Sequence, residues 1–156
     1  MAESEKIDPF SHDHFMRQAL QEAHKALEQG EIPIGAVVVL NNQIIGRGYN
    51  QTERLKDATA HAEMIALTAA FDHIGNKIIP EAKLYVTIEP CMMCSGAIYW
   101  GRIQSIIYGA EDVKSGFLSQ GKHINFKKKE IIKDILKEPC LELMLDFFKS
   151  KRASKA

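Results

Sequence analysis

The chain has 156 residues, of which 46% are hydrophobic and 26% charged, and its 20 basic side chains balance its 20 acidic ones. These values predict one soluble globular domain over residues 1–156 and argue against a protein that binds nucleic acid through overall positive charge. No run approaches the roughly 18 apolar residues of a membrane-spanning helix, and the polar first residues do not resemble a signal peptide. We therefore expect a cytoplasmic protein with no membrane partner, whose three cysteines serve metal or thiol chemistry.

The N-terminal third predicts a helix followed by a β-hairpin. After a disordered segment at 1–9, apolar residues spaced three and four apart predict a helix over about 11–30. The valine-rich run 34–40 predicts an interior strand. Asn41-Asn42 tolerates positive φ and predicts a tight turn into a second strand over 43–49.

The rest of the chain alternates between helices and strands. Gly46 and Gly48 indicate a bulge or a close backbone approach in the second strand, and the polar segment 50–58 indicates a loop. Thr59 is the expected N-cap of a buried helix that starts near Ala60. The further predicted elements are a strand over 84–88, a buried helix from Pro90 to about Tyr99, a strand over 103–108 closed by Gly109, a loop over 112–123, an edge strand at Ile131-Ile132, a helix from Pro139 and a frayed tail at 153–156. This order predicts an α/β layered domain with a mixed sheet.

Three side chains suggest a metal centre. Cys91 and Cys94 have the C-x-x-C spacing, which serves metal binding or dithiol exchange, and on a helix the two thiols share a face. His61, at the start of another predicted helix, is a third candidate ligand. A His/Cys/Cys set leaves one tetrahedral position open, which is typical of catalytic zinc. Cys140 is a rival fourth ligand, but it has no nearby Cys or His, so we interpret it as a buried apolar residue.

Glu63 is the candidate proton carrier. It lies two residues after His61, which on a regular helix separates the side chains by about 200°. Both serve one site only if that site lies over the helix N-terminus, so we predict two helix N-termini directed at one metal, their positive ends favouring thiolate. Zinc lowers the pKa of a bound water toward about 7, and a nearby glutamate can take and return its proton. Without the metal motif, Glu63 would be read as a solvated helix residue.

These residues carry a resemblance. His61-Ala62-Glu63 and Pro90-Cys91-Met92-Met93-Cys94 match the H-x-E…P-C-x-x-C signature of the zinc-dependent nucleoside and nucleobase deaminases, which is already known for base deamination. Within that group the chain resembles the bacterial tRNA-specific adenosine deaminases from about residue 10 to 152. The stretches that match are 32–37, 48–50, 57–63, 84–91, 94–97, 109–112 and 146–148.

The resemblance implies a three-layer α/β/α cytidine deaminase-like domain, whose mixed central sheet of about five strands opens with a β-hairpin and is flanked by helices. It implies a homodimer that converts adenosine to inosine at the wobble position of a tRNA anticodon loop, with one Zn²⁺ per subunit. His61, Cys91 and Cys94 would hold the zinc. Glu63 would shuttle protons while activated water attacks C6 of the base.

The resemblance also implies substrate contacts. Asn50 would hydrogen-bond the purine edge, Ile34 and Ile88 would wall the base pocket, and the backbone of Ala62 would contact the ring. Asp112 would accept a hydrogen bond from a ribose hydroxyl, or it is simply a loop or capping aspartate. The other candidate RNA contacts are Lys114, Phe148, Lys149, Lys151 and Arg152, although a charge run is usually a solvated face.

Two positions depart from the family pattern. Ala58 stands where the family often has proline, and Glu111 stands where it often has a basic residue. Glu111 beside Asp112 makes an acidic spot near the expected RNA groove.

Rival interpretations share parts of the motif. A deaminase of the same fold that acts on free guanine, cytosine or a nucleoside would use the same metal chemistry. A non-catalytic zinc module that binds RNA would need four protein ligands and no Glu63. A dithiol oxidoreductase would need only Cys91 and Cys94.

Overall fold

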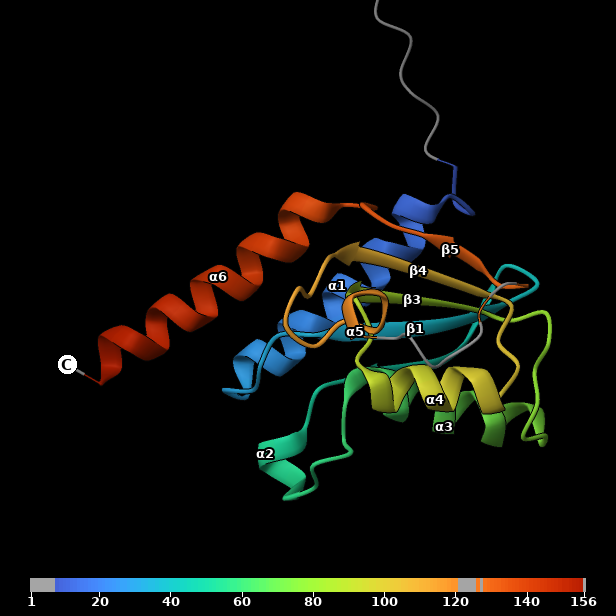
Figure 1. Cartoon of the computed structure of the whole chain (residues 1–156), viewed down its shortest axis with the longest axis horizontal. Coiled ribbons are helices and arrows are strands. Elements are labelled where there is room, and N and C mark those ends of the chain that lie inside the picture. The colour runs from blue at the N-terminus through green and yellow to red at the C-terminus, as the bar shows by residue number, and fades with distance from the viewer. Residues whose placement is uncertain (1–7, 121–125, 127, 156) are drawn as a thin grey trace, which may run out of the picture.

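The computed structural model describes residues 8–120, 126 and 128–155, and within them it contains one mixed sheet with helices against both faces (Figure 1). The strand order is β2-β1-β3-β4-β5; β1 pairs antiparallel with β2 and β3, while β3 with β4 and β4 with β5 are parallel. This confirms the predicted three-layer domain. The elements are α1 (His12–Glu28), β1 (Gly35–Leu40), β2 (Gln43–Tyr49), α2 (Thr52–Leu55), α3 (Ala62–Ile74), β3 (Lys83–Ile88), α4 (Met92–Trp100), β4 (Ser105–Ala110), α5 (Phe117–Gln120), β5 (Glu130–Ile132) and α6 (Lys137–Ser154).

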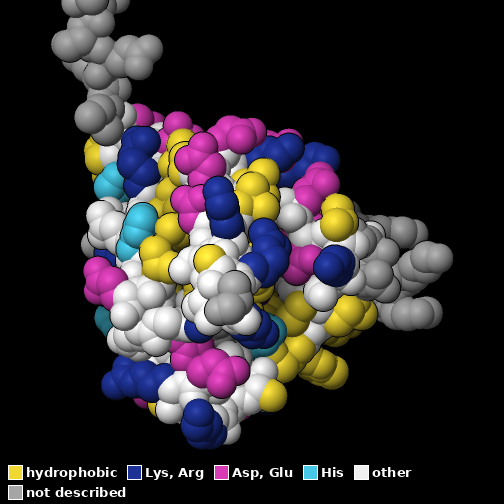
Figure 2. Space-filling model, turned by 90° about the vertical axis from the view of Figure 1, so that its left-hand side faces the viewer, with side chains coloured by type: hydrophobic (Ala, Val, Ile, Leu, Met, Phe, Trp, Pro, Cys, Tyr) yellow, Lys and Arg dark blue, Asp and Glu magenta, His cyan; other side chains and the backbone are white. Residues whose placement is uncertain are grey.

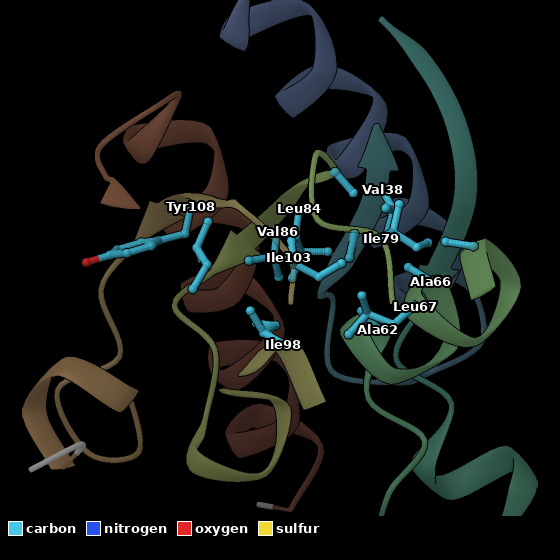
Figure 3. Packing of buried hydrophobic residues seen from close by; sticks show 14 of the residues in the cluster. Val38, Ala62, Ala66, Leu67, Ile79, Leu84, Val86, Ile98, Ile103 and Tyr108 are labelled. Atoms are coloured by element: carbon cyan, nitrogen blue, oxygen red, sulfur yellow. The ribbon is translucent and has the colours of Figure 1, made fainter. Parts of the chain in front are cut away.

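Two apolar cores join the layers. One lies between the sheet and α3 and α4 and contains Leu67 and Ile98 (Figure 3). The other lies between the sheet and α1 and α6 and contains Met16. Val38 packs into the first core and Val37 into the second, which explains why β1 is apolar at nearly every position. No helix in the described part of the chain is long and apolar enough to cross a bilayer.

The first helix and the hairpin agree with their sequence signals. Ser11 caps α1 by accepting a hydrogen bond from the His14 N–H at 3.0 Å. Asn41 and Asn42 have φ values of 50° and 60°, as a tight hairpin turn needs. Of the predicted disordered segment 1–9, residues 1–7 lie outside the described residues.

The two glycines of β2 allow α3 to approach the sheet closely. A Cβ atom on Gly46 would lie 2.2 Å from the Ala66 carbonyl oxygen, and one on Gly48 would lie 2.4 Å from that of Ala62. The pairing of β1 with β2 also shifts register between Val38 and Val39. Both expectations for these glycines, a bulge and a close approach, are therefore confirmed.

The predicted starts of three helices are wrong. The N-cap of α3 is His61 and not Thr59, whose hydroxyl donates to Asp57 Oδ1 at 2.7 Å within the preceding turn. The N-cap of α4 is Cys91, so Pro90 precedes the helix instead of opening it. Helix α6 begins at Lys137, two residues before the predicted Pro139.

Smaller differences follow from tertiary contacts. The predicted loops 50–58 and 112–123 contain the short helices α2 and α5, and residues 121–123 of the second lie outside the described part. Gly109 lies within β4 instead of closing it. Helix α6 approaches this glycine closely, since a Cβ on Gly109 would lie 2.5 Å from Cys140 Sγ. Helix α6 continues to Ser154, into the tail predicted at 153–156.

The two helices predicted to be buried are buried on one side only. Helix α3 buries a face that includes Ala66 and Leu67, while Ala69 is exposed. Helix α4 buries Ile98 but leaves Trp100 78% exposed. The apolar composition of α4 therefore does not come from burial within this chain alone.

Candidate active site

A cavity of about 490 Å³ lies where α3 and α4 begin. Its walls come from the segments before β1 and after β2, β3 and β4, together with one side of α6. It brings together residues that are far apart in the sequence. The predicted site residues that line it are Ile34, Asn50, His61, Ala62, Glu63, Ile88, Cys91, Asp112, Lys114 and Phe148.

His61, Cys91 and Cys94 form a compact cluster at one side of this cavity. The Nδ1 atom of His61 lies 3.6 Å from the Sγ atoms of both cysteines, and all three ligand atoms lie within 4.8 Å of one another. His61 is the N-cap of α3 and Cys91 the N-cap of α4. The two helix N-termini thus meet at one point, as the two-residue spacing of His61 and Glu63 predicts.

The cysteine thiols and the imidazole control one another's protonation. Hydrogen bonds with Cys94 and His61 lower the pKa of the Cys91 thiol to about 3, so that this group is a thiolate at neutral pH. The hydrogen bond to Cys91 raises the pKa of His61. The pKa of Cys94 is raised by its hydrogen bond with the Cys91 sulfur and by burial.

The dimensions of the cluster fit a zinc ion. Zinc–sulfur and zinc–nitrogen bonds of about 2.3 and 2.0 Å in a tetrahedron place neighbouring S and N ligand atoms about 3.5 Å apart, close to the 3.6 Å observed. Thiolate and imidazole donors favour zinc over harder cations. Within the described residues the group has three members and excludes Cys140, which is 1% exposed and whose pKa burial raises to about 12. The prediction that Cys140 is a buried apolar residue is confirmed.

Glu63 is a buried carboxyl group beside this cluster. Its side chain is 4% exposed and lies in the first turn of α3. Burial is the main reason that its pKa is raised, while a hydrogen bond with Cys94 acts in the opposite direction. A carboxyl group with a raised pKa in a cavity is suited to both accept and donate protons near neutral pH. This burial excludes the reading of Glu63 as a solvated helix residue.

The base-sized part of the cavity has apolar walls and a fixed amide. Ile34 and Ile88 lie before β1 and at the end of β3. Asn50, 6% exposed, donates from Nδ2 to the Ile32 carbonyl at 3.3 Å and accepts from the Thr52 N–H at 3.4 Å. These bonds fix the orientation of the amide. Each of the two amide atoms can form one further hydrogen bond, because Nδ2 carries two N–H donors and Oδ1 accepts two bonds.

The remaining predicted residues lie at the rim of the cavity or beyond it. Asp112 and Lys114 line the cavity from the segment after β4, and Phe148 lines it from α6 with 39% of its surface exposed. Lys149 and Arg152 are exposed on α6 and lie outside the cavity lining. Figure 2 faces the end of the molecule where the C-terminal end of α6 and α2 lie, and there basic side chains alternate with acidic ones.

Sequence reasoning missed several lining residues. Ile32 and Thr52 flank the predicted Ile34 and Asn50, so proximity in sequence was a usable signal. Glu89 precedes the P-C-x-x-C motif, and its position within a matched stretch was a second such signal. Leu141 and Met144 lie seven and four positions before the predicted Phe148 on α6, so helical periodicity was a signal for them. The packing of α6 across the sheet brings that face of the helix to the cavity.

Comparison with known proteins agrees with the motifs. A family model described as MafB19-like deaminase matches residues 10–152. The tRNA-specific adenosine deaminase of Streptococcus pyogenes serotype M1 is 42% identical over 148 residues, covering 91% of this chain and 86% of that protein. A solved structure from a study of A-to-I editing by tRNA:A34 deaminases at the wobble position of transfer RNA has a TM-score of 0.77 and 38% identity, covering 83% of this chain and 98% of that one. A guanine deaminase from Nitrosomonas europaea has a TM-score of 0.77 at 18% identity, covering 88% and 84%, and shares the fold.

Proposed function

The chain belongs to the tRNA-specific adenosine deaminases, and we propose from this how its own residues convert adenosine to inosine at the wobble position of a tRNA anticodon loop. The reaction is a hydrolytic deamination. The observation that carries the residue assignments is the meeting of a His/Cys/Cys cluster and a buried glutamate in one cavity.

In this proposal the metal is zinc, and it would be held by His61, Cys91 and Cys94. Bound zinc supplies Lewis acidity, which lowers the pKa of a water ligand toward about 7. The Cys91 thiolate lies at the N-termini of α3 and α4, whose unpaired N–H groups stabilise negative charge. Three protein ligands, and not four, would leave such an ion able to take a water ligand.

Glu63 moves the protons. Its carboxylate takes a proton from the water that attacks C6 of adenine and returns one to the amino nitrogen that leaves as ammonia. Burial supports this role, because a raised pKa brings the carboxyl group closer to the working pH. Exclusion of water from the side chain also strengthens its interactions with the reacting atoms.

The cavity walls orient the base. Asn50 hydrogen-bonds the purine edge through the amide donor and acceptor positions that its bonds to Ile32 and Thr52 do not occupy. Ile34 and Ile88 contact the faces of the ring, and the Ala62 backbone lies at its edge. A base must leave the loop stack to enter such a cavity, and an anticodon loop, being single-stranded, gives up its bases at low cost.

The RNA around the base is held at the rim. Asp112 accepts from a ribose hydroxyl, Lys114 and the α6 cations Lys149, Lys151 and Arg152 contact phosphates, and Phe148 stacks on a neighbouring base. A substrate of this kind gives the protein a cytoplasmic site of action. Asp112 is half-buried on the segment after β4. Lys114 on that segment and the named side chains of α6 are exposed, which supports the assignment.

The protein acts as a homodimer in this proposal, with the outer face of α4 in the interface. Trp100, Tyr99 and Met93 are 78, 46 and 36% exposed on that helix, and Leu118 of the adjacent α5 is 54% exposed. Figure 2 shows hydrophobic side chains gathered on the side where α4 and α5 lie. Aromatic residues and Met are enriched at interfaces.

Trp100→Glu should therefore convert a dimer to a monomer in sedimentation analysis; an unaltered chain that sediments as a monomer would refute the interface.

An assay of substrate choice tests the function. The zinc-loaded protein is incubated with an anticodon stem–loop RNA that has adenosine at the wobble position, with the same RNA carrying guanosine there, and with free adenosine, guanine and cytidine. We expect inosine only from the first RNA. Turnover of a free base without turnover of the RNA would overturn the proposal in favour of a nucleobase deaminase.

A further inference from the structure

Glu89 is a buried acidic residue of the cavity that the proposed chemistry does not use. Its side chain is 4% exposed and lies directly after β3. Oε1 accepts a hydrogen bond from the Asp112 N–H at 3.1 Å, and Oε2 accepts one from the Leu118 N–H at 2.9 Å. The carboxylate thus joins the two ends of segment 112–118.

The middle of this segment is organised by Asp112 itself. Asp112 Oδ1 accepts from the N–H groups of Lys114 and Ser115, each at 3.1 Å. The Asp112 carbonyl accepts from the Gly116 N–H at 2.8 Å. The segment is therefore a compact turn. Asp112 holds its middle, and Glu89 holds its two ends.

The turn is also fitted closely to the strand end that bears Glu89. A Cβ atom on Gly116 would lie 2.3 Å from the carboxyl carbon of Glu89, so only glycine allows this approach. The Phe117 N–H donates to the Pro90 carbonyl at 2.8 Å, and Gly116 forms a β-bridge with Cys91. The wall segment and the metal-binding segment are thereby fixed relative to each other.

This turn forms one wall of the cavity through Asp112, Val113, Lys114 and Ser115. We propose that Glu89 is a positioning residue for the substrate, whose carboxylate holds segment 112–118 against the bound nucleotide. The identity of that substrate rests on the proposed function.

A carboxylate is suited to this task because both of its oxygens accept hydrogen bonds. An amide of the same shape has one acceptor oxygen and one NH₂ group. In Glu89→Gln the NH₂ group would face either the Asp112 or the Leu118 N–H and leave that donor unsatisfied. One end of the turn is then released while the side-chain volume is kept.

The test is the steady-state kinetics of Glu89→Gln on the anticodon stem–loop RNA. We expect KM to rise at least about tenfold, the factor that corresponds to the loss of one hydrogen bond to a charged group. We expect kcat to change by no more than about twofold and the zinc content to stay constant, because the ligands and Glu63 are untouched. A loss of folded protein would instead lower the active fraction without raising KM.

A matched control is Glu22→Gln. Glu22 is an equally buried carboxylate, 2% exposed, but it pairs with Lys25 and Arg47 away from the cavity. Its variant should keep the parental KM. An equal rise of KM in both variants, unchanged kinetics of Glu89→Gln, or a fall of kcat at constant KM would each overturn the proposal.

If Glu89→Gln does not fold, amide hydrogen exchange of the unaltered protein tests the two hydrogen bonds that Glu89 accepts. The N–H groups of Asp112 and Leu118 should exchange more slowly than that of Val113 between them; equal rates would refute the two anchoring bonds. This measurement needs no substrate. Absence of RNA turnover by the unaltered chain would therefore refute the proposed function and leave the role of Glu89 to be decided separately.

Discussion

The first turn of α3 packs directly against Gly48. The variant Gly48→Ala therefore tests whether the distance between α3 and the sheet determines the geometry of the active site. A Cβ atom there would lie 2.4 Å from the Ala62 carbonyl oxygen and 2.6 Å from the Ala66 nitrogen. Ordinary van der Waals contact begins at 3.4 Å. Both atoms belong to the backbone of α3, which cannot rotate away as a side chain does. The start of the helix must therefore move by about 1 Å relative to the sheet.

That displacement acts on His61 and Glu63, which lie at the same helix start. Metal–ligand distances tolerate deviations of only about 0.2 Å, and a misplacement of about 1 Å near the chemistry can lower the rate about 100-fold. Overpacking of this kind also lowers the free energy of unfolding by about 1–3 kcal/mol. We expect kcat/KM on the stem–loop RNA to fall about 100-fold, with a reduced zinc content.

The matched control is Gly46→Ala on the same strand. Its Cβ would meet α3 one turn further on, 2.2 Å from the Ala66 oxygen and 2.9 Å from the Ala70 nitrogen. We expect a similar loss of stability in urea unfolding but near-parental activity per folded molecule. Equal losses of activity in both variants, or parental activity of Gly48→Ala, would refute the reasoning.

Three further changes test separate parts of the molecule. Glu63→Ala should keep the fold and the zinc, measured by metal analysis, and lower kcat by about 100- to 10,000-fold; activity near the parental level would remove Glu63 from the mechanism. Burial raises the pKa of Tyr85 from its usual value of 10.0 to about 12, so the neutral phenol contributes stability that is fully present below about pH 10 and lost as the pH rises through about 12. Urea unfolding should therefore show a shallower alkaline loss for Tyr85→Phe, and parallel curves would contradict the burial argument. Replacing Lys149, Lys151 and Arg152 together by glutamine should reduce the slope of log affinity for RNA against log salt by about 2; an unchanged slope would confine recognition to the cavity.

The candidate metal ligands could be predicted from the sequence. His61, Cys91 and Cys94 belong to the few residue types that bind zinc, and the match to the H-x-E…P-C-x-x-C signature grouped them although His61 and Cys91 are 30 residues apart in the sequence. The strand pattern of β1 and the Asn41-Asn42 turn were local signals. Local rules sufficed for this strand and this turn, because the forces that form them act within a few residues.

The contacts of Glu89 could not be predicted in this way. Its partners Asp112 and Leu118 are 23 and 29 residues away, and no periodicity links them. Glu31 follows the same pattern: it is 1% exposed and accepts from the N–H groups of Glu53 and Arg54. Such buried carboxylates appear in the sequence as ordinary polar residues, and only the tertiary fold shows which backbone donors they satisfy.

The two misplaced helix starts at the site share one physical cause. Thr59 and Pro90 are preferred residues for a helix start, whereas His61 and Cys91 occupy the actual N-caps and make no side-chain capping bond. A lost cap costs each helix about 1 kcal/mol. A thiolate at two positive helix ends compensates part of that loss, because the helix dipoles favour negative charge there. Capping and the proposed metal binding would compete for the same side-chain atoms, so signals for helix starts fail at the two proposed ligands.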